Sequence, residues 1–137
     1  MLSKSLLQAF AATCLINHAV AEPLPNHVAL NERASSCTPT AGGSPTVDDT
    51  PAIESAIKAC PSGNIVIPSG TTYHINSQLS FAGCTGCKFT LDGELSVSTD
   101  FNYWNNKGEI IYLKNIQGAT ITGAGTINGN GQASCKS

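Results

Sequence analysis

Short runs of apolar and β-branched residues alternate with polar and turn-forming residues throughout residues 109–132. The runs at residues 110–113, 119–122 and 125–127 show the two-residue alternation that is typical of β-strands. Glycine and asparagine separate these runs, and both residue types tolerate the positive φ angles of tight corners. No helix of ordinary length fits between the runs, which disfavours a sheet of βαβ units. Short strands joined by bends predict a coil that stacks on itself.

The middle of the chain carries further short strands of the same kind. Residues 64–67 form a mostly apolar run that ends at a Pro-Ser-Gly turn, and more such runs follow up to residue 97. Apolar triplets recur at about 16 to 24 residues, a spacing in the range of β-solenoid coils. The triplets are centred near Val66, Thr90, Ile111 and, less regularly, Ile127. The expected fold class is therefore all-β.

One amphipathic helix is predicted before these strands, from Thr50 to Cys60. Asp49 or Thr50 can cap it, and Pro51 lies in the first turn, where its missing N–H costs nothing. A Pro-Ser-Gly sequence at residues 61–63 ends it. A single amphipathic helix must bury its apolar stripe, so we expect it to pack on the strands that follow. The stripe consists of Ile53, Ala56, Ile57 and Cys60.

The N-terminus has the three parts of a secretory signal. It begins with a positive charge at Lys4, continues with a mostly apolar run from Leu6 to Val20, and reaches a small-x-small cleavage site at residues 19–21. The apolar run is too short to span a membrane. We therefore assign residues 1–21 to a signal peptide and residues 22–33 to a short pro-segment or linker, and we expect a secreted, extracellular protein.

The cysteines agree with export, because an oxidising compartment favours their pairing. Cys37 and Cys60 bracket the helix, and we expect them to form one disulfide. Cys84 and Cys87 form a C-x-x-C, which lacks both a thioredoxin-like βαβ context and further zinc ligands. A local disulfide that pins a turn is the better interpretation. Cys135 is left over, with a partner beyond the terminus or as a free thiol.

Composition limits the class of partner. The chain has 137 residues, of which 41% are hydrophobic and 12% are charged, and its net charge is −2. This length fits one domain at most. The charge gives no electrostatic reason to bind nucleic acid or an anionic membrane, and neither partner is expected.

Several segments, in this order, resemble the N-terminal part of fungal glycoside hydrolase family 28, which includes polygalacturonases, rhamnogalacturonan hydrolases and xylogalacturonan hydrolases. Three of them are DDTPAI at residues 48–53, IVIPSGTTY at 65–73 and ITGAGTINGNGQ at 121–132. The segments FAGCTGCKF at 81–89 and DFNYW at 100–104 look most like the xylogalacturonan hydrolase and exo-acting branch. The resemblance covers nearly all of the mature chain.

The resemblance implies a right-handed parallel β-helix whose first coil is capped by the N-terminal helix. It also implies a secreted enzyme that inverts the anomeric centre as it hydrolyses α-linked galacturonosyl bonds of polygalacturonan or xylogalacturonan. Such an enzyme needs no metal or other cofactor. Its partner would be a pectic polysaccharide, and the full-length enzyme would be a monomer.

The family's catalytic motifs Asn-Thr-Asp, Gly-His-Gly and Arg-Ile-Lys do not occur before the last residue, Ser137. The Asp48-Asp49 pair is not the catalytic Asp-Asp pair, because it lies at the helix start, where carboxylates complement the dipole. No catalytic residue is therefore carried over. We expect residues 34–137 to be the truncated N-terminal part of a β-helix catalytic domain, about the first third of an enzyme, and inactive alone. The alternative is a non-catalytic, secreted, wall-associated or decoy β-helix protein.

Asp92 and Glu94 are the best other candidates for glycosidase chemistry. At i and i+2 on a strand their Cβ atoms would lie about 6–7 Å apart. Inverting glycosidases need two carboxyl groups roughly 6.5–9.5 Å apart, so the spacing permits this role. However, Gly93 breaks the strand, and a solvated turn is the favoured interpretation.

The remaining candidates are weak. His74 is isolated, so neither a triad nor a metal cluster is predicted. Tyr103-Trp104 could stack on a sugar ring, but packing over one end of the coil is favoured. Gly123-Ala124-Gly125 does not qualify as a phosphate loop, because no helix follows it.

Overall fold

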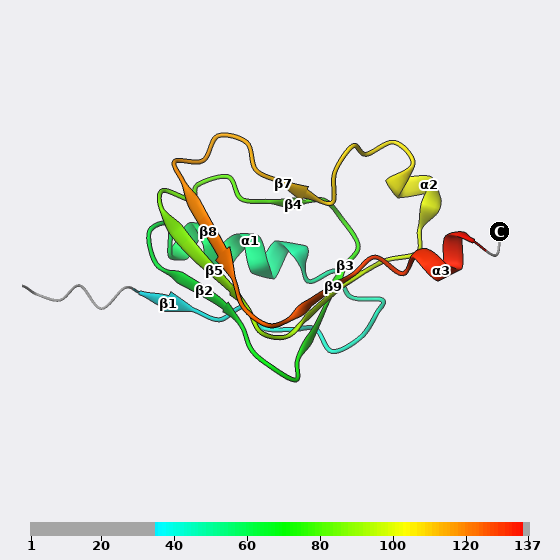
Figure 1. The fold of residues 1–137 in the computed structure, drawn as a ribbon, viewed down its shortest axis with the longest axis horizontal. Coiled ribbons are helices and arrows are strands. Elements are labelled where there is room, and N and C mark those ends of the chain that lie inside the picture. The colour runs from blue at the N-terminus through cyan, green and yellow to red at the C-terminus, as the bar shows by residue number, and fades with distance from the viewer. Residues whose placement is uncertain (1–34, 136–137) are drawn as a thin grey trace, which may run out of the picture. The chain divides into compact units, whose positions relative to one another are not determined.

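The computed structural model describes residues 35–135. The predicted signal peptide at residues 1–21 and the pro-segment at residues 22–33 lie outside the described residues and stay predictions. Within the described part, the chain winds repeatedly through three parallel sheets (Figure 1). No helix of the described residues is long and apolar enough to cross a membrane.

The three sheets form the faces of the coil. Sheet A contains β1 (Ser36–Cys37), β2 (Asn64–Ile67), β5 (Cys87–Leu91) and β8 (Ala119–Thr122). Sheet B contains β3 (Thr72–Ile75), β6 (Glu94–Val97) and β9 (Thr126–Asn128), and sheet C contains β4 (Leu79–Ser80) and β7 (Ile111–Tyr112). Every pairing is parallel and joins strands of successive turns. The predicted all-β class and the parallel β-helix are therefore confirmed.

The strand register corrects the predicted repeat. Val66 and Thr90 do lie opposite each other in sheet A. Ile111, however, pairs with Leu79 in sheet C, and Ile127 lies opposite Leu95 in sheet B. The prediction that all four triplets belong to one series was wrong, because each coil contributes up to three strands and the sequence pattern does not say which sheet a strand joins.

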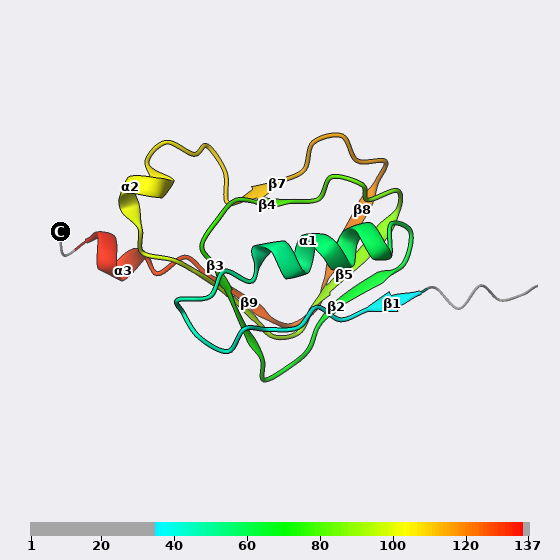
Figure 2. The same ribbon diagram turned by 180° about the vertical axis from the view of Figure 1, so that it is seen from behind.

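Helix α1 (Thr50–Ala59) closes the first end of the stack, as predicted. Its apolar residues Ile53, Ala56 and Ile57 are buried. The helix contacts β1, β3 and β4, one strand from each sheet (Figure 2). Cys60 follows as the C-cap and is also buried. The helix thus covers the core, which the inward-facing residues of the strands form.

The start of α1 differs from the prediction in detail. Asp49 is the N-cap residue, but its carboxylate makes no capping bond to the helix. Instead, it accepts hydrogen bonds from the backbone N–H groups of Gly42 at 2.6 Å and His74 at 2.7 Å. The neighbouring Asp48 carboxylate accepts the N–H of Thr50 at 3.1 Å. The Asp49 side chain is thus used in tertiary hydrogen bonds, and the Asp48 side chain bonds to the N-terminal end of the helix.

The two predicted disulfides are present. Cys37–Cys60 joins β1 to the C-terminal end of α1, and Cys84–Cys87 closes the turn that leads into β5. Both cysteines of the second bridge are fully buried. Cys135 is exposed, and among the described residues it is the cysteine without a disulfide. The bridges therefore fix the first coils.

The other end of the stack presents an open edge at β8 and β9. No described strand pairs with the far side of either strand. Ile121 and Ile127 face the core direction of their sheets, yet each is 47% exposed. Residues 115–135 contain no charged side chain. This edge has apolar groups and free backbone groups without the charges that usually discourage pairing.

Candidate functional site

A column of polar side chains follows the outer face of sheet B. The strand alternation buries Tyr73 and Leu95, so the side chains between the buried ones point outward. The parallel register places His74 opposite Ser96 and Ser96 opposite Asn128. Residues that are far apart in the sequence therefore stand side by side on one polar face.

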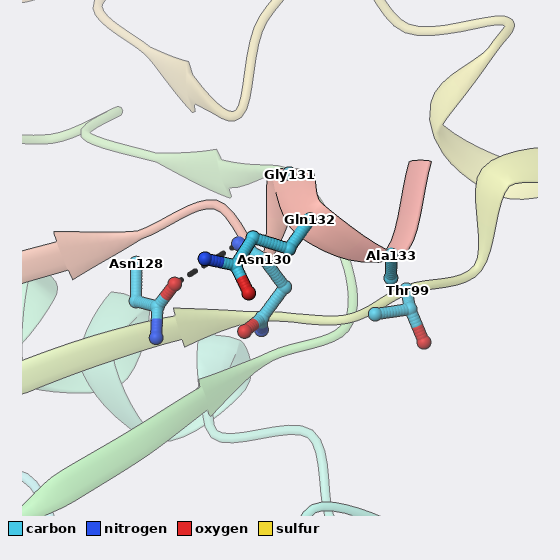
Figure 3. Close-up of a pocket in the computed structure, with 6 residues that line it drawn as sticks. All are labelled: Thr99, Asn128, Asn130, Gly131, Gln132 and Ala133. Carbon is cyan, nitrogen blue, oxygen red and sulfur yellow. Dashed lines mark hydrogen bonds between the residues drawn. The ribbon is translucent and has the colours of Figure 1, made fainter. Parts of the chain in front are cut away.

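An amide-rich hollow lies where this column ends, and Figure 3 shows its residues. We call it the amide hollow. It has a volume of ≈ 550 Å³ and is lined by Thr99, Asn128, Asn130, Gly131, Gln132 and Ala133. The last residues belong to α3 (Gly131–Ser134). Amide groups both donate and accept hydrogen bonds, which suits ligands that carry many hydroxyl groups.

Asn130 holds the amide hollow in shape. Its backbone adopts the left-handed conformation, with φ of 51°, which asparagine tolerates better than most residues. Its Nδ2 donates to the carbonyl oxygen of Val97 at 2.6 Å and to Ser96 Oγ at 3.3 Å. Its backbone N–H donates to Asn128 Oδ1 at 3.0 Å. Asn130 therefore ties the end of β9 to the end of β6.

A second hollow lies beside the connection from β6 to β7, which includes α2 (Phe101–Trp104). We call it the aromatic hollow. It has a volume of ≈ 310 Å³, and its lining includes Ser98, Phe101, Trp104, Lys107, Glu109 and Gly129. Trp104 Nε1 donates to Ser98 Oγ at 3.0 Å, and Tyr103 Oη accepts the N–H of Gln78 at 3.1 Å.

These contacts correct the prediction that Tyr103 and Trp104 cover one end of the coil. Both residues are half-buried at its side, on the connection between sheets B and C (Figure 1). The two rings meet edge to face, with centroids 4.8 Å apart. The sequence predicted that these rings pack, but it did not predict their position, because it did not show that the connection from β6 to β7 is long.

Asp92 and Glu94 are not arranged as the strand pair considered above. Asp92 lies in the turn between β5 and β6, so the two carboxylates do not share a strand face. Asp92 Oδ1 accepts the N–H of Ala124 at 3.2 Å, and Glu94 Oε1 accepts from Asn128 Nδ2 at 3.1 Å. Asp92 is exposed. Asp92 thus lies in a solvated turn, whereas Glu94 begins β6 and is half-buried, and each carboxylate bonds to the next coil.

Glycines shape the same corner of the coil. A Cβ atom on Gly123 would lie 1.9 Å from the carbonyl oxygen of Leu91, and one on Gly125 would lie 2.2 Å from that of Gly93. The segment 123–125 therefore allows two coils to stack closely at a corner. The segment therefore has a structural role at this corner.

Titratable groups near the start of α1 are shifted by local contacts. Burial alone would raise the pKa of the Asp48 carboxyl, but hydrogen bonds from Ser77, Asn76 and Thr50 outweigh it, so this pKa lies below its usual value. Burial, aided by the negative charge of Asp49, raises the pKa of Tyr73. Within residues 35–135, no three His, Cys, Asp or Glu side chains are grouped to hold a metal ion.

Sequence reasoning missed the polar column and both hollows. The signal was present in the outward positions of three strands, because Thr72 and His74, and Glu94 and Ser96, alternate with buried residues, and Thr126 and Asn128 flank the apolar Ile127. Only the strand register shows that these pairs belong together. The column could therefore have been found by aligning the sheet B strands with one another.

The fold and the sequence place the chain in a class of carbohydrate-active enzymes. The family model of glycosyl hydrolases family 28 matches residues 58–137, and the chain belongs to this family. The resemblance stated above is thus confirmed.

Individual relatives narrow the comparison. The chain is 50% identical over 100 residues to a probable endo-xylogalacturonan hydrolase A of Emericella nidulans, a match that covers 70% of this chain and 25% of the relative. It is 42% identical over 100 residues to endo-xylogalacturonan hydrolase A of Aspergillus tubingensis, with the same coverage. The crystal structure of endo-xylogalacturonan hydrolase from Aspergillus tubingensis superposes with a TM-score of 0.69 at 39% identity, covering 72% of this chain and 27% of that one. The chain spans about a quarter of the length of these relatives, less than the third that we predicted.

Proposed function

We propose that this chain is the N-terminal section of a secreted, pectin-degrading hydrolase that cleaves galacturonosyl bonds of xylogalacturonan with inversion. The observation that carries the proposal is the 50% identity to a probable endo-xylogalacturonan hydrolase A. The names of the relatives also favour endo action over exo action. Polygalacturonan, the other backbone considered above, is the less favoured substrate.

Within this function, residues 35–135 contribute architecture and binding surface. The cap helix α1 and the Cys37–Cys60 bridge close one end of the coil. The open edge of β8 and β9 is suited to continue the parallel ladder with a further coil. The described residues offer no pair of opposed carboxyl groups in a cleft, so the acid and base must come from other coils.

A chimera tests this proposal. The chain is produced alone, and also joined at the matching position to the remaining coils of the Aspergillus tubingensis enzyme. Release of reducing ends is measured on xylogalacturonan and on polygalacturonate. We expect no turnover by the chain alone and turnover of xylogalacturonan by the chimera.

Two outcomes would contradict the proposal. A folded chimera without activity would show that this section does not belong in such an enzyme. Turnover by the chain alone that Asp92→Asn or Glu94→Gln abolishes would show that this pair is catalytic after all. The parent enzyme of Aspergillus tubingensis serves as the positive control.

A non-catalytic, secreted, wall-binding protein is the second candidate. The polar column and the two hollows favour it, because they lie within this chain and need no catalytic motif. A mature protein of the length expected for residues 34–137, recovered from culture fluid and retained on insoluble pectin without releasing reducing ends, would support this candidate. Retention on pectin together with release of reducing ends would support the proposal of an enzyme.

A further inference from the structure

The connection from sheet B to sheet C is much longer in one coil than in the coil before it. Residues 76–78 suffice to join β3 to β4, whereas residues 98–110 join β6 to β7. Both connections bridge the same two sheets, so the extra length is not needed to close the coil. Long connections on a rigid scaffold commonly carry binding residues.

This insertion is held in one shape by its own hydrogen bonds. Asp100 Oδ1 accepts the N–H of Tyr103 at 3.1 Å, and the N–H of Lys107 donates to the carbonyl oxygen of Trp104 at 2.9 Å. The bond of Trp104 to Ser98 closes the insertion onto its own first residue, and the bond from Gln78 to Tyr103 fastens it to the preceding coil. A surface that is ordered before binding loses less entropy when a ligand arrives.

Two aromatic rings of the insertion line a small hollow. Phe101 is 41% exposed and Trp104 is half-buried, and both line the aromatic hollow. The same two residues also line a neighbouring hollow of ≈ 390 Å³, together with Asn102 and Asn105. The aromatic pair therefore stands between two spaces, each within the size range of small-ligand sites.

The polar groups around the rings suit an acidic sugar. Lys107 lines the aromatic hollow, and its Nζ lies 5.1 Å from the centroid of the Tyr103 ring. An ammonium group there can pair with a carboxylate. Glu109 also lines the hollow and can accept hydrogen bonds from hydroxyl groups. Aromatic faces offer apolar surface to the C–H side of a sugar ring.

We propose that residues 98–110 form a binding site for a uronic-acid unit of a pectic chain. Phe101 and Trp104 pack against the ring, Lys107 pairs with its carboxylate, and Glu109 accepts from its hydroxyl groups. This inference rests on the proposed function, which names the polymer. The site contains no acid–base pair, so it holds the polymer and leaves cleavage to other parts of the enzyme.

Trp104 makes the proposal testable, because it is the single tryptophan of the chain. The full chain is titrated with trigalacturonate and with a neutral galactose trimer while tryptophan emission is recorded. We expect a saturable change with trigalacturonate. Phe101→Ala should weaken binding of both sugars.

The charge of Lys107 is tested in the same titration. Lys107→Met should weaken trigalacturonate binding by about fivefold at low salt and leave binding of the neutral trimer unchanged. High salt should remove the difference in trigalacturonate affinity between this variant and the parent chain. Lys88→Met, which changes an exposed lysine of β5 in sheet A, is the matched control and should bind like the parent chain. Circular dichroism confirms that each variant is folded.

Two results would overturn the site. One is a folded chain whose tryptophan emission is unaffected by trigalacturonate. The other is equal loss of binding in Lys107→Met and Lys88→Met. The chimera distinguishes failure of the site from failure of the proposed function. An active chimera whose tryptophan emission does not respond to trigalacturonate would refute the site alone. Binding of trigalacturonate by a chimera without turnover would refute the proposed function alone.

Discussion

Asp49 and His74 bond to each other in both directions. The backbone N–H of Asp49 donates to the carbonyl oxygen of His74 at 2.8 Å, and the Asp49 carboxylate accepts the N–H of His74 at 2.7 Å. Asp49 is only 2% exposed. The pair fixes the start of the cap helix to the first strand of sheet B, the sheet that carries the polar column.

Removing the Asp49 carboxylate should therefore destabilise the protein. Asp49→Ala would leave the N–H groups of Gly42 and His74 without this partner, and we expect a loss of about 3 kcal/mol in the free energy of unfolding. Urea denaturation measures it. Glu109→Ala, which removes an exposed carboxylate, is the control and should change this free energy by less than about 0.5 kcal/mol. Equal losses in the two variants would contradict the assigned role.

Asp48 should make stability depend on pH. Its pKa is lowered in the folded protein, so its contribution is complete above the ordinary aspartate pKa of about 4 and is lost as the pH falls through the lower folded value. The melting temperature of Asp48→Asn should thus lie below that of the parent chain at pH 6, and the gap should narrow towards pH 2. A gap that is constant from pH 6 to pH 2 would refute this assignment.

The Cys37–Cys60 bridge should stabilise the first coil. The two cysteines are 23 residues apart, and a loop of this size contributes roughly 3 kcal/mol in the chain-entropy model. The double variant Cys37→Ser, Cys60→Ser should lose about this amount, whereas Cys135→Ser should lose little. Peptide mapping under non-reducing conditions checks the pairing. A bridge from Cys37 to Cys84 or Cys87 would show that the assignment is wrong.

The open edge should make the isolated chain associate. We expect size-exclusion chromatography to show oligomers, because β8 and β9 expose Ile121 and Ile127 and contain no charged residue of their own. Thr120→Lys and Thr122→Lys, which change two exposed residues of β8, should shift the protein towards monomer, and Ser69→Lys in an exposed turn should not. A sharp monomer peak with a cooperative melt above about 60 °C would mean that the chain is self-sufficient.

The tight corner at Gly123 should tolerate no side chain. This residue has φ of +127°, and Leu91 leaves no room for a Cβ atom. Gly123→Ala should lower the melting temperature by several degrees, about the effect of losing 1 kcal/mol or more in a domain of this size. Gly129→Ala, with nothing within 4 Å of its added Cβ, should leave it nearly unchanged. Similar melting temperatures for both variants would contradict the steric argument.

Local sequence signals were sufficient to predict the helix and the two disulfides. The stripe of Ile53 and Ile57 defines a helix within a few residues of chain, and Cys37 and Cys60 simply bracket it. The sheet to which Ile111 or Ile127 belongs depends on the lengths of the preceding connections, which the pattern does not encode. The partners of Asp49 were missed for a similar reason, because His74 reaches it only after a whole strand has been placed.

The candidate site was harder to predict than the fold. Ser96 and Asn128 meet because successive coils stack in register, and neither residue has a motif of its own. The aromatic segment at residues 100–104 was visible in the sequence, but its position at the side of the coil follows from the length of the insertion. Reasoning about single segments therefore identified the residues of interest without showing which of them share a surface.

Because the connections between sheets B and C differ in length, strand pairing and ligand recognition can be carried by different residues. The ladder from β3 through β6 to β9 keeps its register across both a three-residue and a much longer crossing. Residues 98–110 can therefore vary in length without changing the strand register, as long as Trp104 and Ile110 keep their packing against the core. The connection between β6 and β7 is therefore a position where binding loops can be exchanged in evolution, and where new binding segments can be grafted onto an unchanged scaffold.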